Sequence, residues 1–568
     1  MAKALSLPEI LACIGSMLDD KDTISCMQVC KTWTVEFEPF LWRSFTLKQC
    51  DSNHKEERPR LDQLLKNARY IRELVIEHMD PIVQDFFIQC KQLEEVRFDA
   101  QRIDKGDTMV DIWKRFSEMI EDHGRLRKVV IDQIPWAMTD QVLETMERCP
   151  KLIVLETKET ELSAARTQLY LRICSNKLKR LSTWADNYCS PKFPEGLVFQ
   201  EMRYLDICHA TGISMDLQLT WLSRCPNLIS FRWESWTGQV DVDKFCDILS
   251  GGACPNLTAL HLIVTLTDAE IAMILDAAPR IEKLSLPRTG FGPLSFIALR
   301  RHFPTLRDIN LQFCSKVTSP MVQEILRTCA NLQSISAEVL NHSDIIQQPW
   351  ACKGLQMFDV GIDVVIQGGD YEAPISHHNE VYERLAQFTE LNYLSICSET
   401  QADHYDRDPI KVSMEAGLGA LATLKKLTFF SCKTLLDSSD PGEAFEAVEW
   451  MARHWKRLDA FEATALIDSL GPADEEGVGT TEPSVMHILK EHGIKFTEYI
   501  SDRGLDDEDG DFYEANEWTD YEDHMGYEDY ESDFGGYYEH FGPYSDDDDD
   551  YDGHLHFALM GLAGPPPE

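Results

Sequence analysis

Apolar residues recur along most of the chain in one short pattern. An apolar anchor is followed by two other residues, a second apolar residue, one residue and usually a third apolar residue, as in Leu257-x-x-Leu260-x-Leu262. Residues two apart lie on the same side of an extended chain, so each copy predicts a short strand with one buried face. Fifteen anchors occur, at residues 71, 93, 126, 152, 178, 202, 228, 257, 281, 306, 332, 355, 391, 424 and 458.

Helices are predicted between the anchors. Thr267 and Glu270 have capping-box spacing, and Ser319-Pro320 indicates a cap followed by a first-turn proline. Cysteine-proline pairs at 149–150, 225–226 and 254–255 end helices just before an anchor, because the residue before proline is pushed out of helical conformation. Each unit is therefore a strand plus a helix. Most central units span 23–29 residues, and their stacking predicts an α/β solenoid of about fifteen units over residues 67–497, with parallel strands inside and helices outside.

The first 47 residues follow a different pattern. Pro8 suits the first turn of a helix, and apolar residues then recur on one helical face, comprising Leu7, Ile10, Leu11, Ile14 and Leu18. Aspartates at 19, 20 and 22 suit the cap and first turn of a second helix, whose apolar positions are Cys26, Val29, Cys30 and Trp33. A third short segment follows at Pro39-Phe40-Leu41-Trp42. Three short helices this rich in apolar residues cannot bury all of their apolar surface internally, so a partner is predicted to cover one face.

The order of these motifs resembles the F-box. The resemblance is carried by LPEI at residues 7–10, Asp22, Val29-Cys30-Lys31-x-Trp33 and Leu41-Trp42-Arg43, and it departs from the family at Thr23, where leucine usually follows the aspartate. The repeats resemble the cysteine-containing leucine-rich repeats that often follow an F-box. The motifs, the repeats and the composition together predict an F-box-like module at 1–50, a linker at 51–66, the solenoid at 67–497 and a disordered acidic and aromatic tail at 498–568.

The F-box resemblance also implies a role for each part. The N-terminal helices would dock the Skp-type adaptor of a cullin-RING (SCF) ubiquitin ligase, and the repeats would bind the protein to be ubiquitinated. The expected adaptor contacts are Leu7, Pro8, Ile10, Ile14, Leu18, Val29, Cys30, Trp33, Leu41 and Trp42. The alternative is that these side chains form an ordinary N-terminal cap of the repeat array, which any solenoid needs.

Composition narrows the classes of partner. A formal net charge of −42 argues against nucleic acid and anionic membranes as ligands and favours a basic protein substrate. Neither a run of 18 apolar residues nor a signal peptide is visible, so we expect a soluble, intracellular chain in the cytoplasm, the nucleus or both. The 17 cysteines are an odd number spread through the chain, which predicts reduced thiols and no zinc site or other cofactor.

Catalytic motifs are not visible, so the chain is expected to be a non-catalytic subunit. Asp403 to Asp408 and the pair His377-His378 could be imagined as ligand sets, but both are interpreted as loop residues. The long last units indicate insertions at Gly361 to Ala386 and Ser398 to Gly419. These insertions could contact ligands or be plain tolerated loops.

Residues two, four and six after each anchor should line the inner surface of the solenoid, because side chains alternate along a strand. In the middle units they are Arg180, Trp184, Tyr204, Asp206, Arg232, Glu234, His261 and Lys283. Aromatic residues and arginines grouped in this way are typical of a recognition hot spot, and these eight are the expected substrate contacts. A mixed solvated face remains the alternative.

The tail from Asp502 to Asp552 contains 22 acidic residues and one arginine, a net charge of −21, interleaved with twelve aromatic residues. Such a segment is predicted to be disordered and either to attract a basic partner or only to solubilise the chain. Two functions remain open at this point. One is the substrate receptor of an SCF-type ligase, and the other is a non-ligase leucine-rich-repeat regulator with an acidic tail, active in GTPase activation or in binding histones and other basic proteins.

Overall fold

The computed structural model describes residues 7–47, 64–77, 86–99, 109–121, 123–132, 138–158, 161–184, 187–188, 193–194, 196–209, 214–235, 240–364, 374–397, 410–434, 441–464 and 485–498. The chain divides into two compact units, Met1–Gly504 and Leu505–Glu568. The second unit, the predicted tail from Asp502 and the stretch Asp403 to Asp408 lie outside the described residues.

Three short helices open the chain: α1 (Pro8–Gly15), α2 (Asp20–Met27) and α3 (Lys31–Leu41). Pro8 stands in the first turn of α1, as predicted, and the Asp19 carboxylate caps α2 by accepting a hydrogen bond from the Asp22 N–H at 2.7 Å. Leu11 and Phe37 are the fully buried apolar side chains among the described residues of these helices. Gly15 lets α1 approach α3, because a Cβ at this position would come within 2.6 Å of the Phe40 ring.

The predicted second helix, with apolar positions from Cys26 to Trp33, is two helices in the structure. Cys26 lies on α2 and Trp33 lies on α3, because the chain is extended at Cys30, with φ −166° and ψ 164°. The Thr34 hydroxyl stabilises the break by donating to the Met27 carbonyl at 2.7 Å. The predicted third segment at Pro39 is the end of α3, in which the proline is internal.

Seventeen described strands form one sheet in which each strand pairs in parallel with the next along the chain. They are β1 (Ser44–Leu47), β2 (Glu73–Ile76), β3 (Glu95–Asp99), β4 (Lys128–Asp132), β5 (Val154–Lys158), β7 (Arg180–Trp184), β9 (Tyr204–Cys208), β10 (Ser230–Ser235), β11 (Ala259–Val264), β12 (Lys283–Ser285), β13 (Asp308–Asn310), β14 (Ser334–Asn341), β15 (Met357–Asp363), β16 (Tyr393–Ser395), β17 (Phe429–Thr434), β18 (Ala460–Thr464) and β19 (Lys495–Glu498). A second, two-stranded sheet pairs β6 (Glu161–Leu162) with β8 (Asn187–Tyr188).

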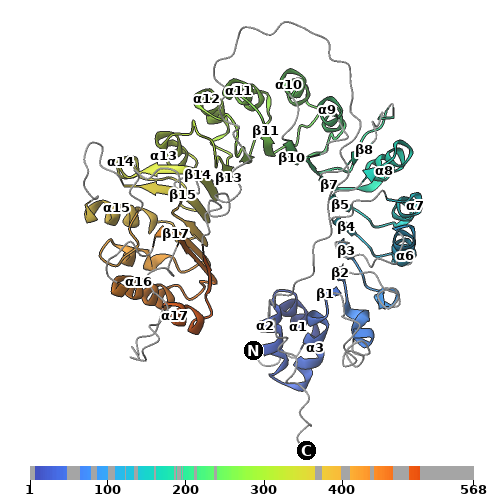
Figure 1. Cartoon of the computed structure of the whole chain (residues 1–568), viewed down its shortest axis with the longest axis horizontal. Coiled ribbons are helices and arrows are strands. Elements are labelled where there is room, and N and C mark those ends of the chain that lie inside the picture. The colour runs from blue at the N-terminus through green and yellow to red at the C-terminus, as the bar shows by residue number, and fades with distance from the viewer. Residues whose placement is uncertain are drawn as a thin grey trace, which may run out of the picture. The chain divides into compact units, whose positions relative to one another are not determined.

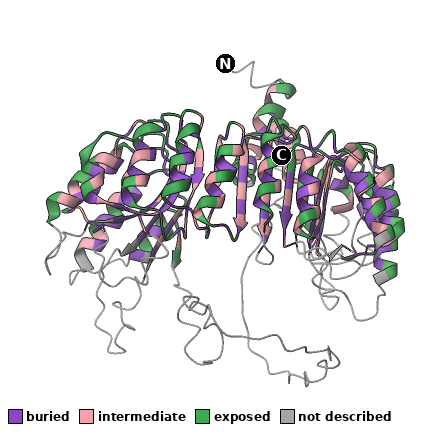
Figure 2. Cartoon of the chain, turned by 90° about the horizontal axis from the view of Figure 1, so that it is seen from above, coloured by how far each residue is buried: buried purple, intermediate pink, exposed green. Residues whose placement is uncertain are grey.

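The helices that follow the strands lie on the outer side of the sheet, and the strands line the inner side (Figure 1). These helices are α6 (Met109–Glu121), α7 (Asp140–Arg148), α8 (Ala164–Lys177), α9 (Met215–Ser223), α10 (Val242–Ser250), α11 (Asp268–Ala277), α12 (Pro293–Leu299), α13 (Ser319–Thr328), α14 (His342–Gln347), α15 (Ile375–Leu385), α16 (Pro441–His454) and α17 (Val485–Glu491), with short 3-10 helices η3 (Ala68–Tyr70), η4 (Arg300–His302) and η6 (Leu418–Thr423). Their buried faces point to the strands and their exposed faces point outward (Figure 2). The predicted α/β solenoid is confirmed.

A recurring turn joins the helical side to each strand and explains the cysteines. The anchor N–H donates to the carbonyl three residues earlier, as from Leu257 to Cys254 at 3.2 Å. Burial raises the pKa of the Cys254 thiol to about 12, so the thiol stays protonated, and it lies 3.4 Å from the Leu222 carbonyl of the previous unit. The same buried position is cysteine in six units, at Cys90, Cys149, Cys225, Cys254, Cys329 and Cys352. The fifteen described cysteines are all free thiols.

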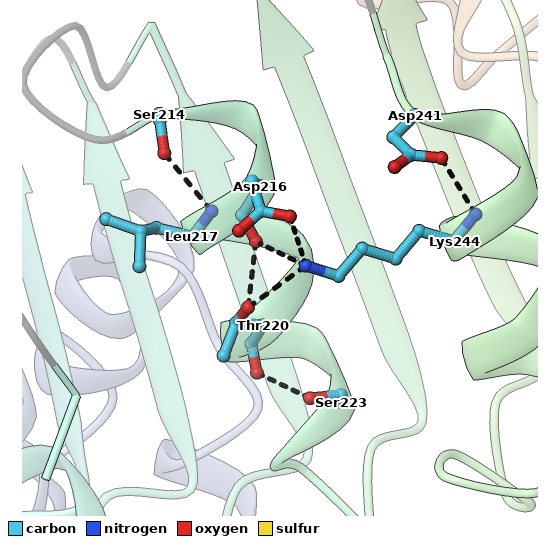
Figure 3. Close-up of polar contacts among 7 residues, drawn as sticks. All are labelled: Ser214, Asp216, Leu217, Thr220, Ser223, Asp241 and Lys244. Atoms are coloured by element: carbon cyan, nitrogen blue, oxygen red, sulfur yellow. Dashed lines mark hydrogen bonds and ion pairs between the residues drawn. The ribbon is translucent and has the colours of Figure 1, made fainter.

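Neighbouring outer helices are joined by polar contacts as well as by apolar packing. At the start of α9 and α10, Ser214 and Asp241 accept hydrogen bonds from backbone N–H groups of their own helices. The Lys244 ammonium group on α10 pairs with the Asp216 carboxylate on α9 and lies 3.3 Å from the Thr220 hydroxyl (Figure 3). These groups are largely exposed, so the pair aligns the two helices but adds little stability.

Fourteen of the fifteen predicted anchors begin their strands as expected, and one is misplaced. Tyr393 pairs with Phe429, so the anchor of β17 is Leu427, and Leu424 occupies the turn position three residues earlier. The sheet also has a strand at each end that the pattern missed, namely β1 and β19. The described parts of the supposed insertion Gly361 to Ala386 belong to β15 and α15.

Candidate functional site

The N-terminal helices carry apolar surface that the rest of the described chain does not cover. Five of the fifteen exposed large apolar side chains of the described residues lie here, within 41 residues of the start: Leu7, Met17, Ile24, Val29 and Val35. These helices bury Leu11 and Phe37 between them and have too few residues to enclose more. The predicted surplus of apolar surface on this segment is therefore present.

The predicted adaptor contacts are all accessible to some degree. Leu7, Pro8, Val29 and Cys30 are exposed. The other six are half-buried, namely Ile10, Ile14, Leu18, Trp33, Leu41 and Trp42. The Trp42 ring faces the solenoid, since its centroid is 6.1 Å from that of Phe45 on β1. Whether these residues touch an adaptor stays a prediction.

Three exposed apolar residues of this segment were not predicted: Met17, Ile24 and Val35. Val35 lies on α3 between Trp33 and Phe37, which occupy the opposite, inward side of the helix. Such a residue can be identified in the sequence as an apolar position that lies outside the buried face of its helix.

The inner surface of the sheet has the predicted strand phase. In β7, Leu181 and Thr183 are buried while Arg180 and Trp184 are exposed. The other six predicted contacts are likewise exposed or half-buried rather than buried among the helices: Tyr204, Asp206, Arg232, Glu234, His261 and Lys283. The side chains therefore line one accessible surface, and their role in substrate binding stays a prediction.

Alternating charges join the strands β3 to β7 along this inner surface. The Asp132 carboxylate is almost fully buried between two cations, pairing with the Arg97 guanidinium and lying 3.2 Å from the Lys158 ammonium group. Lys158 in turn lies over the Trp184 ring, 5.0 Å from its centroid. Lys158 thus lies against one face of the Trp184 ring, and the residue remains 42% exposed.

The next pairs extend the network across β9 and β10. Arg180 lies 3.6 Å from the Asp206 carboxylate and 5.9 Å from the centre of the Tyr204 ring. Arg232 donates to Glu234 at 2.9 Å, and the His209 Nε2 atom lies 3.0 Å from the other oxygen of Glu234. Burial alone would raise the pKa of Glu234, but the hydrogen bond and the charge of Arg232 outweigh it and lower that pKa.

His261 and Lys283 continue this surface onto β11 and β12. Burial, with the charge of Arg232, lowers the pKa of His261 to about 4, so the imidazole is neutral near pH 7. The Lys283 ammonium group pairs with Asp308 on β13. All eight predicted contacts therefore lie on one continuous strip of the inner surface, from β7 to β12.

Several partners in this network were not predicted. Arg97, Asp132 and Lys158 stand four or six residues after earlier anchors, so the same rule applied to the first units would have found them. His209 follows β9 in the left-handed region at φ 52°, where the strand rule no longer applies.

The histidine pair is a correction, because neither histidine lies in a loop. Both are on α15, and as adjacent residues they point to different neighbours. The His377 ring stacks on His342 with centroids 4.0 Å apart, whereas His378 is buried and accepts a hydrogen bond from the Lys411 N–H at 3.2 Å.

Within the described ranges, no three His, Cys, Asp or Glu side chains are grouped as a metal ion would require. No helix in that part of the chain is long and apolar enough to cross a membrane.

A sequence model of the F-box-like family matches residues 6–48. A search among curated proteins gives no match. Among solved structures the chain is similar to TLR13 in its complex with ssRNA13, at 12% identity and a TM-score of 0.33, over 75% of this chain and 62% of that chain. It is also similar to an internalin of Listeria monocytogenes, at 11% identity and a TM-score of 0.30, over 58% of this chain and 75% of that one. The complex of Rad7 and Elc1 in yeast gives 12% identity and a TM-score of 0.36, over 64% of this chain and 91% of that chain. At these values the solved structures carry no argument about function.

Proposed function

From an F-box-like segment that leads into a leucine-rich-repeat solenoid, we propose that this chain is the substrate-recognition subunit of an SCF-type cullin-RING ubiquitin ligase. The observation that carries the proposal is the exposed apolar surface of α1 to α3, which coincides with the F-box-like match. Exposed apolar residues gathered on one small module mark a protein interaction site, and an adaptor of the Skp type is the partner that this segment implies.

The link between the module and the solenoid supports a role in orientation. Residues 44–47 pair one by one with residues 73–76, so β1 extends the sheet directly from the end of α3. The Phe45 ring packs on Phe86 of the first repeats, with centroids 6.0 Å apart. A substrate on the inner surface would therefore be held at a fixed distance from the adaptor. The chain would contribute proximity and orientation, not a nucleophile.

The alternative is a non-ligase leucine-rich-repeat regulator that activates a GTPase or binds histones or other basic proteins. This alternative rests on the acidic tail, which lies outside the described residues. It does not explain why α1 to α3 expose apolar side chains. A basic substrate of the ligase likewise depends on the tail and stays a prediction. We favour the ligase because it accounts for the exposed apolar surface of α1 to α3 and for the F-box-like match at residues 6–48.

Affinity purification of the tagged full-length chain from cells tests the proposal. We expect a Skp-type adaptor and a cullin to co-purify, and the double substitution Leu7→Ala, Pro8→Ala to reduce their recovery at least tenfold, because both exposed side chains lie at the start of α1. The matched control Met273→Ala, Leu294→Ala changes two exposed apolar residues on α11 and α12 and should leave recovery unchanged.

Recovery of a small GTPase or histones in place of an adaptor would favour the alternative. An intact chain that never recovers an adaptor, or a Leu7, Pro8 variant that recovers it fully, would contradict the ligase.

A further inference from the structure

Like charges stand side by side where the strands β4, β5, β7 and β9 begin. The residues just before these four strands are Arg127, Ile153, Lys179 and Arg203. Backbone hydrogen bonds join them into a row, from the N–H of each member to the carbonyl of the one before it, at 2.8–2.9 Å. Neighbouring strands lie about 4.8 Å apart, so Lys179 and Arg203 place two cations next to each other. Like charges at neighbouring positions repel, so this arrangement does not serve the stability of the fold.

The same row pairs opposite charges elsewhere in the solenoid. Arg72 and Glu94 stand just before β2 and β3, and their side chains lie 3.6 Å apart. Glu282 and Arg307 stand just before β12 and β13, and their side chains lie 3.5 Å apart. At the start of β7 and β9 this neutralisation is missing.

Positive charge without a partner extends over all four strands. The turns that lead into them, at residues 125–127, 151–153, 177–179 and 201–203, hold six cations and one carboxylate, that of Glu201. Arg125 donates to Gln92, and Lys177 donates to three backbone carbonyls at the end of α7. The remaining cations are exposed and have no hydrogen bond or ion pair from their side chains to any described residue: Arg127, Lys151, Lys179 and Arg203. We call these four residues the basic edge.

The basic edge suits an anion that the fold does not supply. Its charge is local, because the whole chain carries a formal net charge of −42. At physiological salt the repulsion from charges elsewhere on the chain is screened beyond about 8 Å, so a ligand in contact with the edge responds mainly to these four cations. Flexible lysine and arginine side chains can each reach a carboxylate of an extended ligand.

The length of the basic edge decides the shape of the ligand. From Arg127 to Arg203 the row crosses three strand spacings, or about 14 Å. A single carboxylate or phosphate group reaches only neighbouring cations, whereas about four residues of extended peptide, at about 3.3 Å each, cover the whole row. Nucleic acid carries its charge beyond such a length, into the acidic surroundings of the edge, where it is repelled. A short run of acidic residues confines its charge to the edge.

We propose that the basic edge binds an acidic segment of a partner protein, in which four to six Asp or Glu residues follow closely on one another. The carboxylates of this segment supply the counter-charges that Lys179 and Arg203 lack in the fold. None of the four cations is among the eight expected substrate contacts, and the proposal does not depend on adaptor binding.

A titration by fluorescence anisotropy tests the site on the purified full-length chain. The probe is a fluorescein-labelled peptide with six consecutive glutamates, in 50 mM NaCl. We expect saturable binding that weakens several-fold in 200 mM NaCl, because exposed charges are screened. A labelled oligonucleotide of six thymidines should bind more weakly than the peptide.

One variant and one control locate the binding. Lys179→Glu gives the row the order of charges found at Glu282 and Arg307, so the new carboxylate pairs with Arg203. This variant should weaken the peptide at least tenfold, because one cation is lost, a second is engaged and a repelling charge is added, and its melting temperature should stay the same or rise. Lys425→Glu makes the same charge change at an exposed lysine without a side-chain partner among the described residues, and should weaken binding less than twofold.

The absence of saturable peptide binding would overturn the proposal, and so would equal losses of affinity in Lys179→Glu and Lys425→Glu. Tighter binding of the oligonucleotide would overturn it in favour of nucleic acid. A melting temperature of Lys179→Glu several degrees below that of the unmodified chain would also overturn it, because the cations would then serve the fold. Recovery of the adaptor by Lys179→Glu is measured separately, so a failure of this site leaves the proposed function standing.

Discussion

Val29→Glu should abolish binding of a purified Skp-type adaptor and leave the free chain folded. Val29 lies between α2 and α3 and is 62% exposed, so its replacement in the free chain removes little packing. Full burial of a valine is worth about 1.5–3 kcal/mol, so an adaptor that covers the exposed part gains about 1–2 kcal/mol from it.

The magnitude follows from the two terms that the glutamate changes. The valine contribution is lost, and burial of a carboxylate without a partner adds a penalty of at least about 2 kcal/mol. A total of about 3–4 kcal/mol corresponds to an affinity loss of more than 100-fold. Val29→Ala removes only two methyl groups and should weaken binding by about 1 kcal/mol, or roughly fivefold.

Isothermal titration calorimetry of the adaptor into the full-length chain measures both losses. The matched control is Ile297→Glu on α12, because Ile297 is 61% exposed and the charge change is the same. Circular dichroism melting of each variant checks the fold. The reasoning is refuted if Val29→Glu binds within threefold of the unmodified chain, or if Ile297→Glu loses as much affinity as Val29→Glu.

Three further predictions concern the inner surface. Trp184→Ala with Tyr204→Ala should lower the recovery of substrate proteins that co-purify with the tagged full-length chain at least fivefold and shift the melting temperature little, since both residues are 42% exposed; unchanged recovery would count against a recognition role. The pKa of His261 is about 4 in the fold and about 6.5 unfolded, so the unfolded chain holds more protons between these values and stability falls as pH drops through them. At pH 5.5 this loss is about 1 kcal/mol, and it should vanish in His261→Asn when urea unfolding is compared at pH 7.5 and 5.5. Asp132→Asn removes the buried carboxylate that Arg97 and Lys158 share and should lower the free energy of unfolding by about 1.5–3 kcal/mol, against less than about 1 for the exposed Asp216→Asn, a contrast that equal urea midpoints would contradict.

The strands were predictable because their signal is local. A leucine of the repeat must be buried and its neighbours along the strand must alternate, so the buried position of Leu181 and the exposed positions of Arg180 and Trp184 on the inner surface follow from the sequence alone. The one misplaced anchor arose because Leu424 and Leu427 are three residues apart and both satisfy the same spacing. Only the pairing of Phe429 with Tyr393 distinguishes them.

The contacts of the site were less predictable because they join different repeats. Arg97 and Asp132 are 35 residues apart, and His209 and Glu234 are 25 apart. Repeat lengths vary along this chain, so the residues that face one another depend on the register between strands. The break between α2 and α3 was missed for another reason, since the extended conformation of Cys30 follows from contacts such as that of Thr34 with Met27 and not from residue preference.

The claim that the N-terminal helices dock the adaptor while the inner surface stays free is tested most directly by hydrogen–deuterium exchange of the full-length chain, with and without a purified Skp-type adaptor. The account predicts slower exchange within residues 7–41 on adding the adaptor, and unchanged exchange in the strands β7 to β12. Unchanged exchange at residues 7–41, or protection that falls on β7 to β12 instead, would contradict it.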